Sequence, residues 1–256
     1  MGAALAIAKR EWKAYFASPL GFVLLILFSL LLGLFVYLWS PFGVPTLFAR
    51  QSADLSGVFA ARHLPLLFVL FGAAISMRLW SEERRLGTEE LLLTLPVRPI
   101  DAVLGKFLGA MGMLVLCLAT TLPTVYVVWS LCDDPRGLEW GPIFGGYAGS
   151  LVLGATCIAL GQLASAFTRD QLVAFLVAFT LLALWFFLGD LATNLAPHLP
   201  ERFAGAANEV QQYGLTALFD SVDRGVILMK NLVFLVSACA LLLGLNAAVL
   251  TWRKAG

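Results

Sequence analysis

Side chains that could carry out catalysis are sparse in this sequence and form no known catalytic pattern. The two histidines, His63 and His198, belong to no HExxH motif, and no GxSxG motif occurs. Gly105 and Lys106 lack the earlier glycine of a phosphate-binding Walker A loop. No Cys/His cluster has the spacing of a zinc site. The sequence therefore predicts a chain that is not an enzyme, holds no metal or other cofactor, and draws the energy for any work from a partner.

Soft ligand atoms come closest together at Met111, Met113 and Cys117, where they could suggest a path for a soft metal ion. Residues two apart do not share a helix face, and methionine commonly fills gaps in cores. We therefore interpret these residues as packing residues.

The densest charge in the chain lies between residues 78 and 106. Ser81 can cap the start of a helix, with Glu82 and Glu83 in its first turn, where the helix dipole favours acidic groups. Gly87 interrupts that pattern. This part of the sequence predicts a short charged helix that begins at Ser81 and ends near Gly87.

A second short helix is predicted directly after the first. Thr88 can cap it, it covers Glu89–Leu95, and Pro96 ends it. The two helices would form a hairpin that exposes the leucine ridge Leu91–Leu93. Such a ridge is more typical of a docking surface than of a solvated loop.

The rest of the chain, which must position this charged segment, is strongly apolar. Of its 256 residues 60% are hydrophobic and 13% are charged, whereas a soluble domain carries about 25% charged residues. This composition excludes a water-soluble globule and a disordered chain. The net charge of +1 gives no overall field that would favour nucleic acid. The chain is predicted to be an all-α integral membrane protein whose environment is the lipid bilayer.

Six segments contain enough apolar residues to cross a bilayer as helices. They are Leu20–Trp39, Leu64–Met77 with an extension to Trp80, Phe107–Leu131, Ile143–Phe167, Leu172–Leu188 and Asn231–Trp252. Most of the 17 lysines and arginines fall on the side that carries both chain ends. The positive-inside rule therefore predicts a multi-pass protein of the inner (plasma) membrane with cytoplasmic N- and C-termini.

Residues 1–18 are predicted to form an amphipathic helix in the membrane interface rather than a solvated extension. One face would carry Leu5, Ala8, Trp12, Tyr15 and Phe16, and the other Lys9, Arg10, Glu11 and Lys13. The cluster of Trp12, Tyr15 and Phe16 lies where the chain must turn into the bilayer, and aromatic residues favour that level.

The longest stretch on the opposite side of the membrane covers residues 189–230. In its second half Leu215, Leu218, Phe219, Val222 and Val226 share one helical face. We expect an interfacial or re-entrant helix there, within a single transmembrane domain that covers residues 1–256.

Three motifs resemble those of the ABC-2 type permease family, most closely its gliding-motility-associated branch. They are Glu82-Glu83-Arg84-Arg85-x-Gly87-Thr88-x-Glu90-Leu91-Leu92-Leu93-Thr94-x-Pro96-Val97 followed by Leu104-Gly105-Lys106-Phe107, then Thr168-Arg169-Asp170-Gln171-Leu172-Val173-Ala174, and Asp220-Ser221-Val222-Asp223-Arg224-Gly225-Val226-Ile227. The resemblance extends from about Ala8 to Arg253, which is nearly the whole chain.

The resemblance implies the permease subunit of an exporter that works as a homodimer or as a heterodimer of closely related subunits. Two separate cytoplasmic ATPase subunits would bind ATP and Mg²⁺. Residues 1–18 would be the connecting helix and residues 81–97 the coupling helix that docks on the ATPase. Within that helix the family motif covers Glu82, Glu83, Arg84, Gly87, Thr88, Glu90, Leu91, Leu92 and Pro96. By this resemblance Glu82, Glu83 and Arg84 would make ionic contacts with the ATPase, and Leu91 and Leu92 would make apolar contacts with it. Gly87 would form the turn.

Two further functions remain open at this point. One is a membrane scaffold of an envelope or motility complex that transports nothing. The other is a secondary transporter or channel, which is disfavoured because ionisable residues are expected at depth in such proteins and the predicted spans contain none well inside. The short outer loops imply that any large extracytoplasmic domain would belong to a separate accessory protein.

Overall fold

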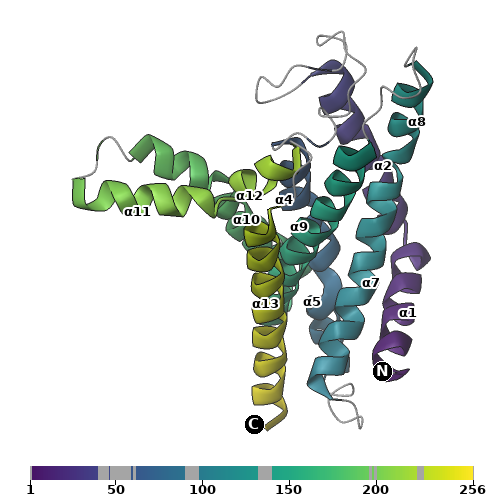
Figure 1. Ribbon diagram of the computed structural model, residues 1–256. Helices are drawn as coiled ribbons and strands as arrows, with labels where there is room; N and C mark the ends of the chain where they lie inside the picture. Colours follow the sequence, from purple (N-terminus) through teal and green to yellow (C-terminus); the bar gives the residue numbers. More distant parts are fainter. Residues whose placement is uncertain are drawn as a thin grey trace.

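The computed structural model describes residues 2–39, 46, 59, 62–89, 98–131, 140–195, 198, 201–223 and 228–255. Within this part of the chain every regular element is a helix, and the helices form one bundle with a lateral arm (Figure 1). Both chain ends lie at the same end of the bundle, which we call the terminal end.

Six helical stretches are long and apolar enough to cross a membrane, as the sequence predicts. They are α2 with η1 (Leu20–Gly33 and Leu34–Leu38), α4 with α5 (His63–Ser76 and Arg78–Leu86), α7 with α8 (Pro99–Ala119 and Leu122–Leu131), α9 (Trp140–Phe167), α10 (Gln171–Leu195) and α13 (Met229–Ala255). The all-α transmembrane architecture is therefore confirmed.

The predicted starts of the charged helix and of the third span were wrong. Ser81 does not begin a helix, because Met77 keeps helical dihedral angles and joins α4 to α5. The Ser81 hydroxyl instead donates to the Met77 carbonyl oxygen, one turn earlier in the same helix. The third span begins at Pro99 rather than Phe107, because Pro99 is preorganised for the first helical turn and Arg98 before it is extended. Lys106 consequently lies inside this helix, whereas the sequence analysis places it just before the span.

The central helices differ from the peripheral ones in how much of their surface other helices cover. In the most apolar 18-residue stretch of the α4–α5 span 78% of the residues are buried. The corresponding share is 28% in α10 and 17% in α13. The exposed residues of α10 and α13 are largely apolar, among them Leu184 and Leu241. These faces therefore suit lipid or a second subunit rather than water.

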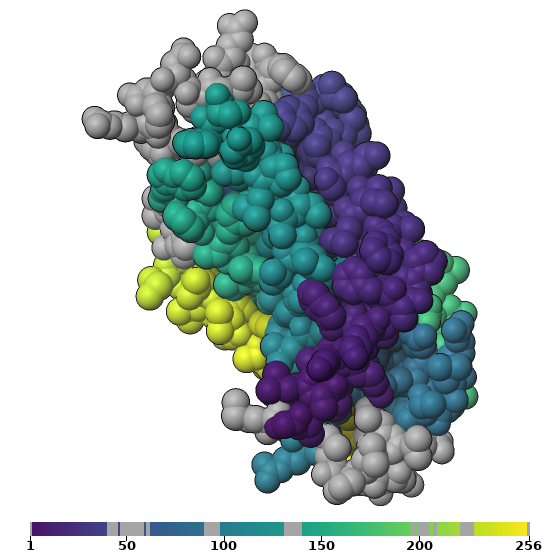
Figure 2. Space-filling model, turned by 90° about the vertical axis from the view of Figure 1, so that its right-hand side faces the viewer, coloured from purple at the N-terminus to yellow at the C-terminus, as the bar shows by residue number. Residues whose placement is uncertain are grey.

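Helix α1 (Gly2–Ala17) lies directly along α7, as the space-filling view shows (Figure 2). A Cβ atom added at Gly105 would come within 2.7 Å of the Ala4 carbonyl oxygen, and one added at Gly109 within 2.6 Å of the Glu11 Cβ. Residue numbers rise together along this contact, so the two helices run in the same direction. Glycine permits this close approach because it has no side chain.

We expect Gly105→Ala to lower the melting temperature of the detergent-purified protein. The added methyl group must displace the Ala4 carbonyl, and overpacking costs about 1–3 kcal/mol. In Gly33→Ala the new methyl group meets nothing within 4 Å, so the better helix propensity of alanine should leave the stability equal or higher. Equal melting temperatures for the two variants would contradict the α1–α7 packing.

In the described part of residues 189–230, two helices lie between α10 and α13 where the sequence predicted one. Helix α10 continues to Leu195, beyond the predicted end at Leu188, and α11 (Glu201–Gln212) folds back beside it. The resulting hairpin projects sideways from the bundle (Figure 1). The predicted second-half helix is α12 (Leu215–Asp223), which buries Leu215, Leu218 and Phe219 within the protein. The side chain of Val222 and all of Val226 lie outside the described residues, and the interfacial or re-entrant position stays a prediction.

Candidate functional site

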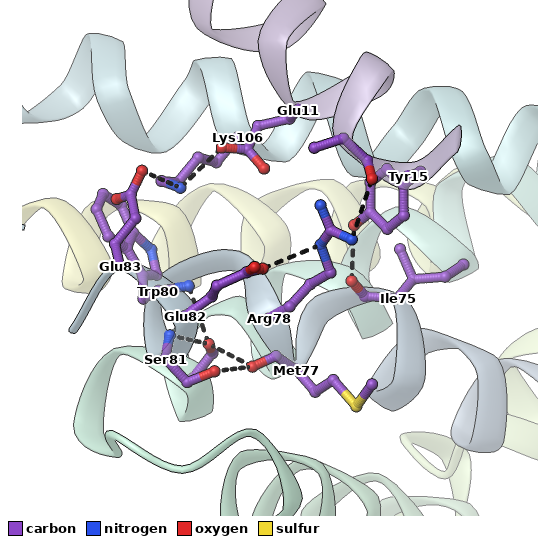
Figure 3. Close-up of polar contacts among 12 residues, drawn as sticks. Glu11, Tyr15, Ile75, Met77, Arg78, Trp80, Ser81, Glu82, Glu83 and Lys106 are labelled. Carbon is purple, nitrogen blue, oxygen red and sulfur yellow. Dashed lines mark hydrogen bonds and ion pairs between the residues drawn. The ribbon is translucent and has the colours of Figure 1, made fainter. Parts of the chain in front are cut away.

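Helix α5, in the described part of the charged segment, meets α1 and α7, and Figure 3 shows the polar contacts among them. Helix α5 packs its first turn inward, with Leu79, Trp80 and Ser81 fully buried. It ends at Gly87, which adopts a left-handed conformation with φ 70° and donates its amide to the Arg84 carbonyl oxygen. Glycine takes this conformation more readily than other residues do. The left-handed backbone at Gly87 therefore explains why the helix ends there, as the sequence predicted.

A buried lysine joins these three helices. The Lys106 ammonium lies 2.9 Å from a Glu11 oxygen of α1 and 3.0 Å from a Glu83 oxygen of α5, and its side chain is 1% exposed. It also lies 4.8 Å from the centre of the Trp80 ring, a cation–π distance (Figure 3). Arg10 completes the group through ion pairs with Glu11 at 2.9 Å and with Glu83. We call Arg10, Glu11, Glu83 and Lys106 the Lys106 cluster.

The charges of the Lys106 cluster balance, two positive against two negative. Burial by itself would raise the pKa of the Glu11 carboxyl, but the Lys106 ammonium and the Arg10 guanidinium outweigh it, so the pKa lies below its usual value. The ionised form of Glu11 is thus the one that suits the folded protein. Removing one member of such a group leaves an uncompensated buried charge, which costs about 3–5 kcal/mol.

The lowered pKa of Glu11 predicts a loss of stability in acid. A carboxyl whose pKa is depressed by folding contributes stability above its unfolded pKa, near 4.5, and loses it as the pH falls through the folded value. We expect the melting temperature of the wild type to fall below about pH 4.5, and that of Glu11→Gln to start lower and fall less. Glu209→Gln, at an exposed position, serves as the control. Parallel pH curves for Glu11→Gln and the wild type would contradict the role of Glu11.

A second set of contacts fastens α1 to the α4–α5 helix. The Tyr15 hydroxyl donates to the Ile75 carbonyl oxygen at 2.7 Å, and the Arg78 guanidinium lies 4.6 Å from the centre of the Tyr15 ring. Tyr15 is fully buried, and burial raises its pKa. Of the other predicted aromatic residues, Trp12 covers Gly112 and packs on the half-buried Phe16 at 5.8 Å between ring centres.

The buried face of α1 differs from the predicted one. The structure buries Ala4, Ile7, Glu11 and Tyr15, whereas Leu5, predicted on the apolar face, is 63% exposed. The assignment of Glu11 to the polar face was wrong, because Lys106 supplies a charged partner inside the protein. The interfacial position of α1 in a membrane stays a prediction.

Helix α5 is fastened on its other side to α9 and α13. The Ser165 hydroxyl accepts the backbone amides of Trp80 and Ser81 at 3.1 Å each and donates to the Met77 carbonyl oxygen at 2.9 Å. These bonds satisfy polar groups at the junction between α4 and α5.

Two arginines cap the last turn of α9. Arg84 and Arg253 donate to the Ala166 carbonyl oxygen at 2.9 and 2.6 Å, where cations favour the negative end of the helix dipole. Glu89 bridges the two arginines at 3.2 and 3.0 Å. A movement of α5 would therefore pull on α9 and α13 as well as on α1 and α7.

The structure separates the residues predicted for docking into two groups. Glu83 and Arg84 face inward, with side chains 12% and 16% exposed, and bond to their own chain. Glu82 is 39% exposed and pairs with Arg78 at 3.6 Å. Gly87 and Thr88 are exposed beyond it. Glu90, Leu91, Leu92 and Pro96, and with them the predicted second short helix, lie outside the described residues.

Sequence reasoning missed Lys106, Glu11, Glu89 and Arg253. One available signal was the position of Lys106 beside Gly105, in a run where glycines recur at residues 105, 109 and 112. Such spacing indicates a close helix–helix contact, and a lysine there needs an acidic partner. For metal binding, no group of three His, Cys, Asp or Glu side chains comes together among the residues that the structure describes.

The comparison with protein families gives one finding. The sequence model of a family described as ABC-2 family transporter protein matches residues 5–249. A search of the curated proteins finds no match.

Proposed function

Since the chain belongs to the ABC-2 transporter family, we propose that it is the membrane-spanning permease subunit of an ATP-binding cassette exporter, driven by a separate cytoplasmic ATPase subunit. The observation that carries this proposal is the way in which α5 is bonded to its neighbours. Helix α5 continues the second span, bonds directly to α1, α7 and α9, is linked to α13 through Glu89, and ends in an exposed turn. A helix fixed in this way can pass a force from a partner to the spans.

The terminal end is proposed to be the cytoplasmic side of the inner membrane. An even number of spans agrees with both chain ends lying at one end of the bundle (Figure 1). Lys9, Arg10, Arg84, Arg85 and Arg253 lie at that end, as the positive-inside rule favours for a cytoplasmic side.

Coupling would follow from the contacts of α5. The ATPase is proposed to dock on the exposed surface at Leu86–Thr88 and on the segment that continues to residue 97. A partner that binds one arrangement of α5 more tightly shifts the population towards it. The Lys106 cluster would carry that shift to α1 and α7, and the Arg84–Glu89–Arg253 contacts to α9 and α13. Packed helices move between discrete arrangements rather than deforming continuously.

The assembly is proposed to contain two permease subunits, as a homodimer or a heterodimer of related chains. The uncovered apolar faces of α2, α10 and α13 support this proposal, because a second subunit would cover part of them and lipid the remainder. The gliding-motility branch is a finer assignment supported by the sequence motifs alone, and a separate extracytoplasmic accessory protein remains an expected partner.

Affinity purification of the tagged chain from native membranes in mild detergent tests the proposal. We expect mass spectrometry to find a stoichiometric partner that carries a Walker A motif. A permease should raise the ATP hydrolysis of that partner, and a mutation in the partner's ATP site should abolish the function of the complex. Recovery of the intact chain without any ATPase would instead favour a scaffold or channel.

A further inference from the structure

A groove of about 450 Å³ lies at the terminal end, on the side of α5 away from the Lys106 cluster. Three spans contribute to it at the level where their apolar stretches begin or end. They are α2 through the turn at Ser18–Leu20, α4–α5 through Met77–Arg85, and α10 through Gln171. In a membrane this level is that of the lipid headgroups.

One wall of the groove is basic and holds two polar atoms that make no hydrogen bond among the described residues. Arg78 is 92% buried; its guanidinium donates to the Ala14 carbonyl oxygen at 3.4 Å and pairs with the Glu82 carboxylate at 3.6 Å, but its Nε atom makes no hydrogen bond among the described residues. The Ser18 hydroxyl is also buried without a partner in the described part of the chain. Arg85 is exposed and pairs with none of the described residues. Buried donors without acceptors are costly, so they indicate a missing acceptor.

The opposite wall of the groove is apolar. It is made by Leu20 and Val23 of α2 and by Met77 at the α4–α5 junction. Val23 is 46% exposed, on the outer side of the bundle. A ligand in this groove would therefore meet arginines and a hydroxyl at one end and hydrocarbon at the other.

We propose that this groove binds an anionic phospholipid, with its phosphate between Arg78, Arg85 and Ser18 and its acyl chain along Leu20, Val23 and Met77. Phosphate oxygens would accept from the Arg78 Nε, the Arg85 guanidinium and the Ser18 hydroxyl. Basic pockets between spans on the cytoplasmic side suit such headgroups. Two arginines against the single Glu82 leave the groove with a positive charge. This site requires membrane insertion but no ATPase partner, so its test is independent of the proposed function.

Lipid retention by the purified full-length chain tests the proposal. The protein is placed in a mixture of phosphatidylglycerol and phosphatidylcholine with identical acyl chains, and retained lipid is counted by native mass spectrometry. We expect preferential retention of phosphatidylglycerol. Arg85→Gln should lower that retention about fivefold, which corresponds to about 1 kcal/mol for one basic residue near the headgroups. Arg85 makes no contact that the fold requires, so this variant should keep the wild-type melting temperature.

Further variants make the result specific to the groove. Ser18→Ala should also lower the retention, whereas Glu82→Gln should raise it by removing the competing carboxylate. Arg98→Gln is the matched control, because Arg98 is exposed at the same end of the bundle but outside the groove. Equal retention of the two lipids, or equal values for Arg85→Gln and Arg98→Gln, would overturn the proposal.

A soluble phosphate compound could satisfy the same donors, and competition distinguishes the two sources. We expect excess inorganic phosphate to leave the bound phosphatidylglycerol in place, because phosphate lacks the apolar contacts. Release of the lipid by phosphate alone would assign the groove to a soluble phosphate ligand and overturn the lipid assignment.

Discussion

Lys106→Met is expected to destabilise the protein more than any other single exchange in the described part of the chain. It removes the cation between Glu11 and Glu83, and the two buried carboxylates then face each other with only Arg10 to compensate them. Breaking a buried ion pair costs about 3–5 kcal/mol, which corresponds to a fall of about 10 °C in the melting temperature for a chain of this size. Thermal unfolding of the detergent-purified protein measures this effect.

Two companion variants decide whether charge is the cause. In the triple variant Lys106→Met, Glu11→Gln and Glu83→Gln no buried charge is left without a partner, so much of the lost stability should return. Lys254→Met removes an exposed lysine at the same end and should have little effect. If the triple variant is no more stable than Lys106→Met alone, the loss comes from packing around Trp80 and not from the ion pairs.

Gly87→Val is expected to give the largest effect on function. Gly87 ends α5 with φ 70°, and a β-branched side chain strains that conformation by about 1–2 kcal/mol. The turn that the ATPase is proposed to bind would then adopt another backbone path. We expect the permease-dependent ATP hydrolysis of the reconstituted complex to fall about tenfold, because a loss of about 1.4 kcal/mol in binding is sufficient for that.

The asparagine variant is the control for Gly87. Asparagine tolerates the left-handed region, so Gly87→Asn should retain most of the activity. Gly87 is exposed and a Cβ there meets nothing within 4 Å, so Gly87→Asn should keep a melting temperature near that of the wild type, and Gly87→Val should lose only the few degrees that its backbone strain costs. Equal activity of Gly87→Val and the wild type, with the ATPase still bound, would contradict a coupling role for this turn.

The sequence predicts the spans well because a run of about 20 apolar residues is a local signal. It predicts the end of α5 at Gly87 for the same reason, since a glycine interrupts a helix by its own conformational preference. The start of that helix was misjudged, because burial of Leu79 and Trp80 and the bonds from Ser165 outweigh the capping preference of Ser81.

The Lys106 cluster could not be predicted by local reasoning, because Glu11 and Lys106 are 95 residues apart in the chain. Read alone, Lys9, Arg10, Glu11 and Lys13 form the charged face of a helical turn, and solvent is the expected environment of each. Only the close approach of α1 to Gly105 and Gly109 brings Glu11 beside Lys106. The inward orientation of Glu83 and Arg84 has the same explanation, because their partners lie on α1, α7 and α9 and at Glu89.

The parallel packing of α1 on α7 sets an order of events during biosynthesis. The surface that receives α1 does not exist until the ribosome has made the third span, about a hundred residues after α1 itself. Until then Glu11 has no buried cation beside it, and α1 must wait in water or at the bilayer surface. Helix α1 is therefore synthesised well before the surface on which it packs, and it can dock only after α7 has been made.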